Sequence, residues 1–177
     1  LFRSIDLDAA ERCFPSGGFT CSDDDFKIEN AVRWPDVPID QACKATDACD
    51  NHSPTFWSRK RLTTITTKYL NAGSYRTVDT YALGQSFSQL TDGELLLDSV
   101  TRTGGDGPAK ITTPQVRFSM APMANRVEGL HSLPGMWRSR LHTIFTETGQ
   151  NVSIAYSGDD GQAGRAKPMC TPSTIPS

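Results

Sequence analysis

Five cysteines are the residues whose spacing most constrains the chemistry of this 177-residue chain. Cys13 and Cys21 enclose the polar loop CFPSGGFTC, and Cys43 and Cys49 enclose CKATDAC. Each pair brackets a span short enough for one local disulfide, so we predict the pairs Cys13–Cys21 and Cys43–Cys49. Cross-pairing stays open, because four cysteines allow three connectivities that spacing alone does not separate. Cys170 is left over, either as a free thiol or with a partner beyond Ser177.

The histidines offer little for catalysis or for binding zinc. Zinc sites favour closely spaced cysteine pairs with histidines at matching distances, and neither His131 nor His142 has such a companion. His52 lies next to Ser53 and close to Asp50, but a triad requires convergence in space rather than in sequence. No GxSxG, HExxH or phosphate-loop motif occurs. We therefore predict no catalytic residue, no metal ligand and no cofactor, and expect the protein not to be an enzyme.

Two acidic loops contain the ligand type that calcium prefers. The stretches SDDDF at 22–26 and SGDDGQ at 157–162 place carboxylates among Ser and Gly residues. Neither has the twelve-residue ligand spacing of an EF-hand, and loops are commonly acidic because they face water. Solvated loops are the simpler interpretation, with calcium as the alternative.

Three tryptophans allow a second kind of binding site. Trp34, Trp57 and Trp137 either pack into a core or line a face on which a sugar ring stacks. Packing is favoured, because a tryptophan buries a large apolar area and the chain has only three of them. Trp57 and Trp137 are the stacking candidates if the chain is a free-standing β-sandwich module that binds carbohydrate.

Composition narrows the class of protein further. The net charge is −2 and 21% of the residues are charged, which favours neither nucleic acid nor an anionic membrane as partner. The basic trio at 59–61 is therefore interpreted as a solvated strand end. No apolar run reaches the roughly 20 residues that a membrane-spanning helix needs. Two disulfides indicate a secreted protein, and the absence of an initiator Met suggests an excised or processed piece of a longer one.

The pattern of residues divides the chain near Pro54. Residues 1–53 are predicted to be irregular and cysteine-bearing, with a short alternating strand in IDLDA at 5–9. Ser22 followed by Asp25 forms a capping box that predicts at most two helical turns. Residues 54–157 are predicted to form an antiparallel β domain, and residues 158–177 a flexible tail.

Strand signals dominate the second part. β-Branched and alternating residues fill four stretches, and GGDGP marks a turn between the last two. About five to seven strands, with almost no helical periodicity, predict an all-β antiparallel fold. The four stretches are RKRLTTITTKYL, YRTVDTYALGQSF, ELLLDSVTRT and AKITTPQVRFSM.

A hairpin is predicted at the end of this domain, over 137–157. It should turn at Thr148-Gly149-Gln150, with Gly149 at positive φ, and Leu141 should face inward. Side chains alternate along the return strand, so Val152, Ile154 and Tyr156 should share one face. The stretches RLTTITT at 61–67 and RLHTIFT at 140–146 are also alike, either by chance or as a repeated unit.

The hairpin resembles a YD repeat. In that pattern an Arg-Leu pair leads into a β-hairpin with a glycine-containing turn, whose return strand ends in Tyr-Asp. The matching residues here are Arg140, Leu141, Ile144, Gly149 and Tyr156. The chain departs from the pattern at Ser157, where Asp is expected. Six further phrases resemble the segment that precedes the repeats in long secreted RHS-repeat proteins of Gram-positive soil bacteria: AERCFPSG, WPDVPIDQAC, SPTFWSRKRLTTITT, VDTYALGQSF, SVTRTGGDG and NRVEGL.

This resemblance implies a structural role. RHS proteins, Tc toxins and teneurins use YD hairpins to build a hollow β-shell, in which each hairpin relies on its neighbours for burial. The chain is then expected to be a non-enzymatic shell segment of a polymorphic-toxin-type protein, building or capping a container around an effector. Its partners would be the rest of the parent polypeptide and the enclosed effector, and its location extracellular. An isolated segment should expose sheet edges and tend to pair edge to edge.

Overall fold

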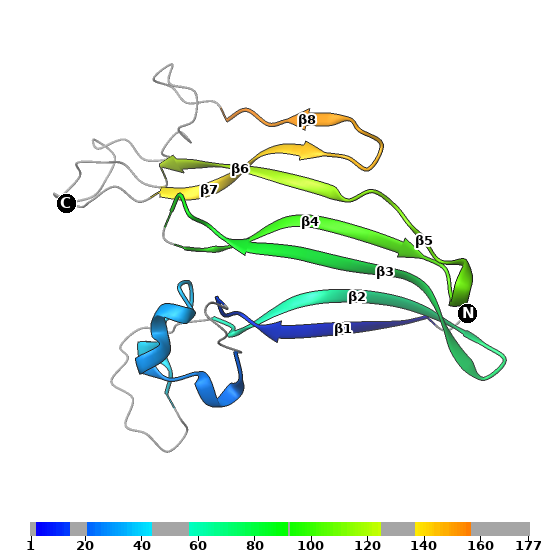
Figure 1. The fold of residues 1–177 in the computed structure, drawn as a ribbon, viewed down its shortest axis with the longest axis horizontal. Coiled ribbons are helices and arrows are strands. Elements are labelled where there is room, and N and C mark those ends of the chain that lie inside the picture. Colours follow the sequence, from blue (N-terminus) through cyan, green and yellow to red (C-terminus); the bar gives the residue numbers. More distant parts are fainter. Residues whose placement is uncertain (1–2, 15–20, 44–56, 92, 125–136, 157–177) are drawn as a thin grey trace, which may run out of the picture.

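The computed structural model of the chain describes residues 3–14, 21–43, 57–91, 93–124 and 137–156. In this part, eight strands form a single antiparallel sheet in the order β1-β2-β3-β4-β6-β7-β8, with β5 paired to β4 (Figure 1). This confirms the predicted all-β antiparallel fold. The strands are β1 (Arg3–Glu11), β2 (Lys60–Asn71), β3 (Ser74–Phe87), β4 (Leu95–Gly104), β5 (Ile111–Thr112), β6 (Val116–Ala124), β7 (Trp137–Phe145) and β8 (Asn151–Ser153).

Local sequence explains where the strands begin and end. The β2–β3 hairpin turns through Ala72 and Gly73, both at positive φ, which is the backbone that a tight two-residue hairpin requires. The stretch predicted as one strand over 109–120 is divided into β5 and β6. Pro114 lies between them, and it has no N–H to donate to a ladder. A short 3-10 helix, η4 (Gly107–Ala109), precedes β5.

The first strand belongs to the sheet. β1 pairs with β2 along its whole length, from Arg3 opposite Tyr69 to Glu11 opposite Lys60. The predicted boundary at Pro54 is corrected to this extent, because the strand predicted within 5–9 extends to 3–11 and adds to the sheet edge. Among the described residues before Pro54, those after β1 form no strand.

That irregular part forms a small unit at one end of the sheet, which we call the disulfide lobe (residues 12–14 and 21–43). It contains three 3-10 helices, η1 (Asp23–Asp25), η2 (Ile28–Arg33) and η3 (Ile39–Gln41). The predicted capping box is present, because the Asp25 carboxylate accepts from both the backbone N–H and the hydroxyl of Ser22. The helical turns are thus as short as expected.

The lobe encloses the main buried core of the described residues. Cys13, Trp34, Val37 and Ile39 pack together, and Trp34 is only 1% exposed. The predicted Cys13–Cys21 disulfide is confirmed and closes a loop within the lobe, directly after β1. The sheet, by contrast, buries only Phe87 and Met123 among its large apolar side chains.

Candidate functional site

The strand register gathers apolar side chains on one face of the sheet. Residues that are paired directly across neighbouring strands point to the same side of the sheet. A row of such partners across several strands therefore lies on one face. Leu83, Val100 and Val116 form the central row. We call this side the apolar face, and its residues are Leu7, Ile65, Tyr81, Leu83, Leu97, Val100, Val116, Phe118, Met120, Leu141, Ile144 and Val152.

β-Bulges preserve this face along the strands. The register shifts between Gly84 and Gln85 and leaves Asp98 of β4 without a direct partner. Leu97 and Val100 are three residues apart and would point to opposite sides of a regular strand, but the bulge restores them to one face. His142 is the extra residue of a second bulge, in β7, and it places Leu141 and Ile144 on one face.

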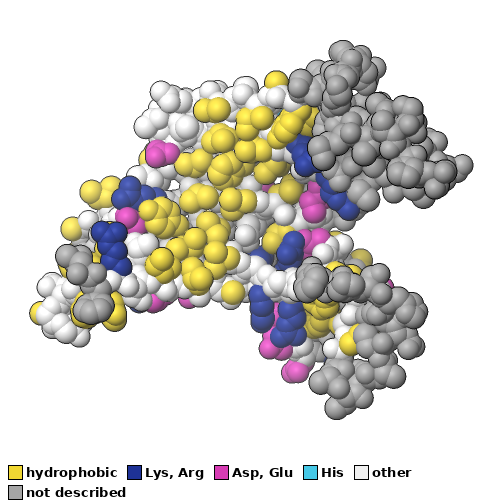
Figure 2. Space-filling view, turned by 180° about the vertical axis from the view of Figure 1, so that it is seen from behind, with side chains coloured by type: hydrophobic (Ala, Val, Ile, Leu, Met, Phe, Trp, Pro, Cys, Tyr) yellow, Lys and Arg dark blue, Asp and Glu magenta, His cyan; other side chains and the backbone are white. Residues whose placement is uncertain are grey.

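Figure 2 shows hydrophobic side chains spread as a band across this face. None of the twelve residues is buried, and Leu7 is 62% exposed while Val152 is 48% exposed. The other ten are partly exposed, so no second layer of described residues buries this face. Exposed apolar patches of this extent mark interaction surfaces in soluble proteins.

The opposite side is rich in hydroxyl groups, and we call it the threonine face. Thr66, Thr80, Thr103 and Thr112 form one row across β2, β3, β4 and β5. The hydroxyls of Thr103 and Thr112 lie 2.9 Å apart and hydrogen-bond. A row of this kind stabilises strand pairing and is compatible with water, so the two sides of the sheet differ sharply in polarity.

The disulfide lobe covers only the end of the apolar face. Asp36 links the two parts, because its Oδ2 accepts from Nε of Arg12 at 2.8 Å and from the backbone N–H of Leu95 at 2.9 Å. Phe14 packs edge-on against Phe87 of β3, with ring centroids 5.9 Å apart. The lobe is fixed at the β3–β4 end and leaves the middle of the face open (Figure 1).

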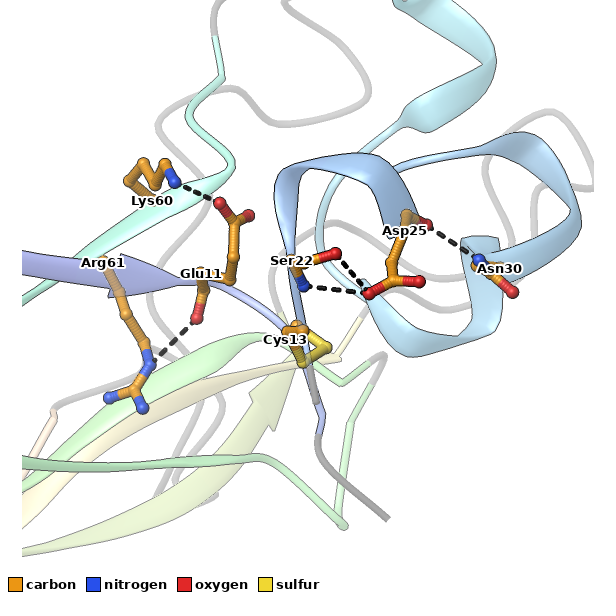
Figure 3. The surroundings of a disulfide bond; sticks show 8 residues. Glu11, Cys13, Ser22, Asp25, Asn30, Lys60 and Arg61 are labelled. Atoms are coloured by element: carbon orange, nitrogen blue, oxygen red, sulfur yellow. Dashed lines mark hydrogen bonds and ion pairs between the residues drawn. A yellow bond between two sulfur atoms is a disulfide. The ribbon is translucent and has the colours of Figure 1, made fainter. Parts of the chain in front are cut away.

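A charged cluster secures the junction of β1, β2 and the lobe. Asp23 is 2.9 Å from Lys60 and 2.7 Å from Arg59. Lys60 also bonds to the Glu11 carboxylate, as Figure 3 shows. Hydrogen bonds involving Lys60 and then Glu11, with the nearby Arg59 charge, lower the pKa of Asp23 to about 2. The pKa of Lys60 is raised by its bonds to Glu11 and Asp23.

Two carboxylates of the acidic loop at 22–26, for which calcium was the alternative interpretation, are engaged in contacts within the protein. Asp23 is held in ion pairs, and the side chain of Asp25 caps η1. Among the described residues, no group of three His, Cys, Asp or Glu side chains is arranged to hold a metal ion. The second acidic loop, at 157–162, lies outside the described residues.

The predicted hairpin is present in β7 and β8. Gly149 adopts φ 86°, and the backbone N–H of Thr146 donates to the carbonyl of Gln150 at 2.9 Å. The assigned return strand is shorter than predicted and ends at Ser153, although the N–H of Ile154 still donates to the His142 carbonyl at 2.8 Å.

The YD-like residues meet across this hairpin. The hydroxyl of Tyr156 donates to the backbone carbonyl of Leu141 at 3.0 Å, which ties the end of the return strand to the Arg-Leu pair. Ile144 is paired with Phe118 on one side and Val152 on the other. Arg140 is half-buried opposite Ala121. The Tyr156 bond is a contact that residue spacing alone did not indicate.

The tryptophans do not form one stacking platform. Trp34 and Trp57 both pack in the lobe region, where the Trp57 ring lies 5.7 Å from that of Phe26. Trp137 begins β7 and is 46% exposed. The strands β2 and β7 are four strand spacings apart in the sheet order, roughly 19 Å. Packing is thus the observed role of two of the three.

The remaining candidates divide into described and undescribed residues. His142 is exposed at the β7 bulge with its Nδ1 2.9 Å from Oγ1 of Thr143, as expected of a solvent-facing strand residue. Cys43 is in a disulfide, with a partner outside the described residues. The predicted partner Cys49, the unpaired Cys170, and His52 and His131 also lie outside them, so those predictions stay untested.

In the described part of the chain, no helix is both long and apolar enough to cross a membrane.

Comparison with known proteins adds no relative. The chain matches no protein-family model, no curated protein and no solved structure.

Proposed function

We propose that this chain is a non-enzymatic structural segment of a secreted RHS-type β-shell, which builds or caps a container around an effector. The observation that carries the proposal is the single-layer sheet with an uncovered apolar face. Folded domains bury such a face against a second layer. A shell segment meets this requirement through the rest of the shell and its contents, with the threonine face turned to water.

The two outer strands support the same role. The outer sides of β1 and β8 have no strand neighbour among the described residues. β1 is nine residues long, so it presents a row of N–H and C=O groups that further strands can extend. A sheet that continues in the parent protein would pair these edges.

The hairpin supports continuation on the β8 side. Tyr156 anchors the return strand to β7 through the Leu141 carbonyl, so the hairpin keeps its form at the sheet edge. The apolar face also reaches this edge, because Val152 is paired with Ile144 and is half exposed. A following hairpin would cover that side chain.

Amide hydrogen exchange tests the shell proposal. We expect the outward-facing amides of β1 and β8 to exchange quickly in this chain and slowly in the longer parent polypeptide, because neighbouring strands would pair them. The parent reading frame beyond Ser177 should also encode further Arg-Leu…Gly…Tyr-Asp units. Equal exchange in the two polypeptides, without such units, would contradict the proposal.

The exposed Trp137 favours one other candidate, a carbohydrate-binding β module. Stacking of a sugar ring on Trp137 would give glycan binding that is lost in Trp137→Ala. Trp57→Ala serves as the matched control, because Trp57 packs against the lobe core. A glycan array with no binding to the chain would remove this candidate and leave the shell proposal unaffected.

A further inference from the structure

The middle of the apolar face is almost free of charge. Val100 lies between Leu83 and Val116 in the central row. On the same face, Arg102 near the C-terminal end of β4 forms an ion pair with Asp79 of β3 at 2.9 Å, so the two charges compensate each other. The centre therefore offers an apolar surface without an unpaired charge that would oppose burial.

The chain itself supplies too little apolar material to cover this surface. The three longest stretches outside the described residues are 44–56, 125–136 and 157–177. Their large apolar side chains are few, and most belong to the twelve-residue stretch between β6 and β7: Phe56, Val127, Leu130, Leu133, Met136, Met169 and Ile175. A second layer over all the strands requires a surface comparable to the sheet itself.

A second copy of the chain has a surface of the right size. Seven neighbouring strands about 4.8 Å apart, each about nine residues long, span a face of roughly 900 Å². Stable interfaces bury about 800 Å² on each partner. A two-fold arrangement places the same apolar face on both sides, and aligned sheets pack about 10 Å apart.

We propose that two copies of this chain pack their apolar faces together and form a two-layer β-sandwich. The pairing goes beyond the shell role, in which the same face is covered by the shell and its contents. It leaves the threonine faces in water on the outside of the sandwich. It also leaves the outer edges of β1 and β8 unpaired, which distinguishes it from edge-to-edge association.

Neighbouring residues on β4 provide a matched test. Val100 points to the apolar face, whereas Thr101 is paired with Ala82 on the threonine face. We expect sedimentation equilibrium to give a dimer for the unmodified chain. Val100→Lys should raise the dimer Kd by roughly a thousandfold, because each dimer carries the change twice and one central hot spot accounts for about thirtyfold. Thr101→Lys should leave the Kd within about threefold.

Folding and geometry are checked on the same samples. Circular dichroism shows whether Val100→Lys keeps its sheet, and the near-isosteric Val100→Thr should weaken the dimer by a smaller factor if Val100→Lys unfolds. A strictly monomeric chain at about 100 μM would overturn the proposal. A dimer that survives Val100→Lys, with the outward amides of β1 protected from exchange, would overturn it in favour of edge pairing. Neither result bears on the shell proposal, which rests on exchange in the parent polypeptide.

Discussion

The disulfide lobe and the sheet reach stability by different means. The lobe has little regular structure, but it closes around Trp34 and is tied by the Cys13–Cys21 disulfide. The sheet is far larger and its strands are hydrogen-bonded to their neighbours, but of its large apolar side chains only Phe87 and Met123 are buried. The part of this chain with less regular structure therefore has the better buried core.

The difference identifies which part is complete. A unit that buries its own apolar groups needs no partner, whereas a single-layer sheet depends on a second surface. The same kind of substitution should therefore have a large effect in the lobe and a small one on the isolated sheet. Each of the following predictions tests that asymmetry.

The largest effect is expected at Trp34. Trp34→Ala should lower the free energy of unfolding of the lobe by about 3–5 kcal/mol, because it empties a fully buried site. Trp137→Ala is the control on the sheet, where the side chain is 46% exposed, and should cost less than about 1 kcal/mol. Urea unfolding followed by hydrogen exchange measures both. Equal losses would mean that the sheet has a buried core of its own.

Removal of the disulfide should cause the next largest loss in the free energy of unfolding. The chain-entropy model assigns about 2.5 kcal/mol to a loop closed by cysteines eight positions apart. The double variant Cys13→Ala, Cys21→Ala should lose about that amount, with faster amide exchange confined to the lobe. A change in exchange across β6 and β7 of similar size would show that the disulfide stabilises the whole sheet instead.

The sequence predicted most of the sheet because its signals are local. Alternating β-branched residues located four of the strands, and Gly149 located the last turn at the residue that adopts positive φ. Pro114 also indicated the break between β5 and β6, although the stretch was interpreted as one strand. These features depend on neighbours within a few positions.

Long-range features were harder to predict. The apolar face depends on bulges at residues such as Asp98 and His142, and its signal was the three-residue spacing of Leu97 and Val100. Asp36 joins Arg12, the residue directly after β1, to Leu95 at the start of β4, which is 59 positions away, and no local pattern indicates such a partner. The threonine row likewise emerges only when four strands are aligned.

The turn at Gly149 should show a moderate effect. Gly149→Val should cost about 1–2 kcal/mol, because a β-branched residue resists the left-handed backbone there. A Cβ at this position would meet no atom within 4 Å, so the cost is conformational rather than steric. Gly149→Asn is the control, since asparagine tolerates this region better. Thermal unfolding compares the two, and equal losses would contradict the backbone explanation.

The hydroxyl of Tyr156 should contribute less. Tyr156→Phe removes the donor to the Leu141 carbonyl and should cost about 1 kcal/mol, with faster exchange of the Ile154 amide. Tyr75→Phe is the control in the β2–β3 hairpin, because that side chain is 53% exposed. If both changes were neutral, the Tyr156 bond would not anchor the hairpin.

The smallest expected effect is a pH dependence that separates the two regions. Burial raises the pKa of Glu94, but hydrogen bonds from Thr91 and from Ser139 outweigh it and lower the value from 4.5 to about 2. Asp23 in the lobe also has a pKa of about 2. Folding favours the ionised form of both groups, so their contributions are complete above about pH 4.5 and disappear as the pH falls towards 2.

Salt should distinguish these two carboxylates. The side chain of Asp23 is 67% exposed and acts through ion pairs, so its contribution should weaken at about 1 M salt. Glu94 accepts from the Ser139 N–H at 2.8 Å and bridges the β3–β4 connection to β7, so its contribution should persist. The thermal unfolding midpoint should therefore fall as the pH is lowered from 5 to 2. Glu94→Gln should reduce this pH dependence at any salt concentration, whereas Asp23→Asn should reduce it only at low salt. Identical salt responses would mean that the lobe and the sheet are held by the same kind of interaction.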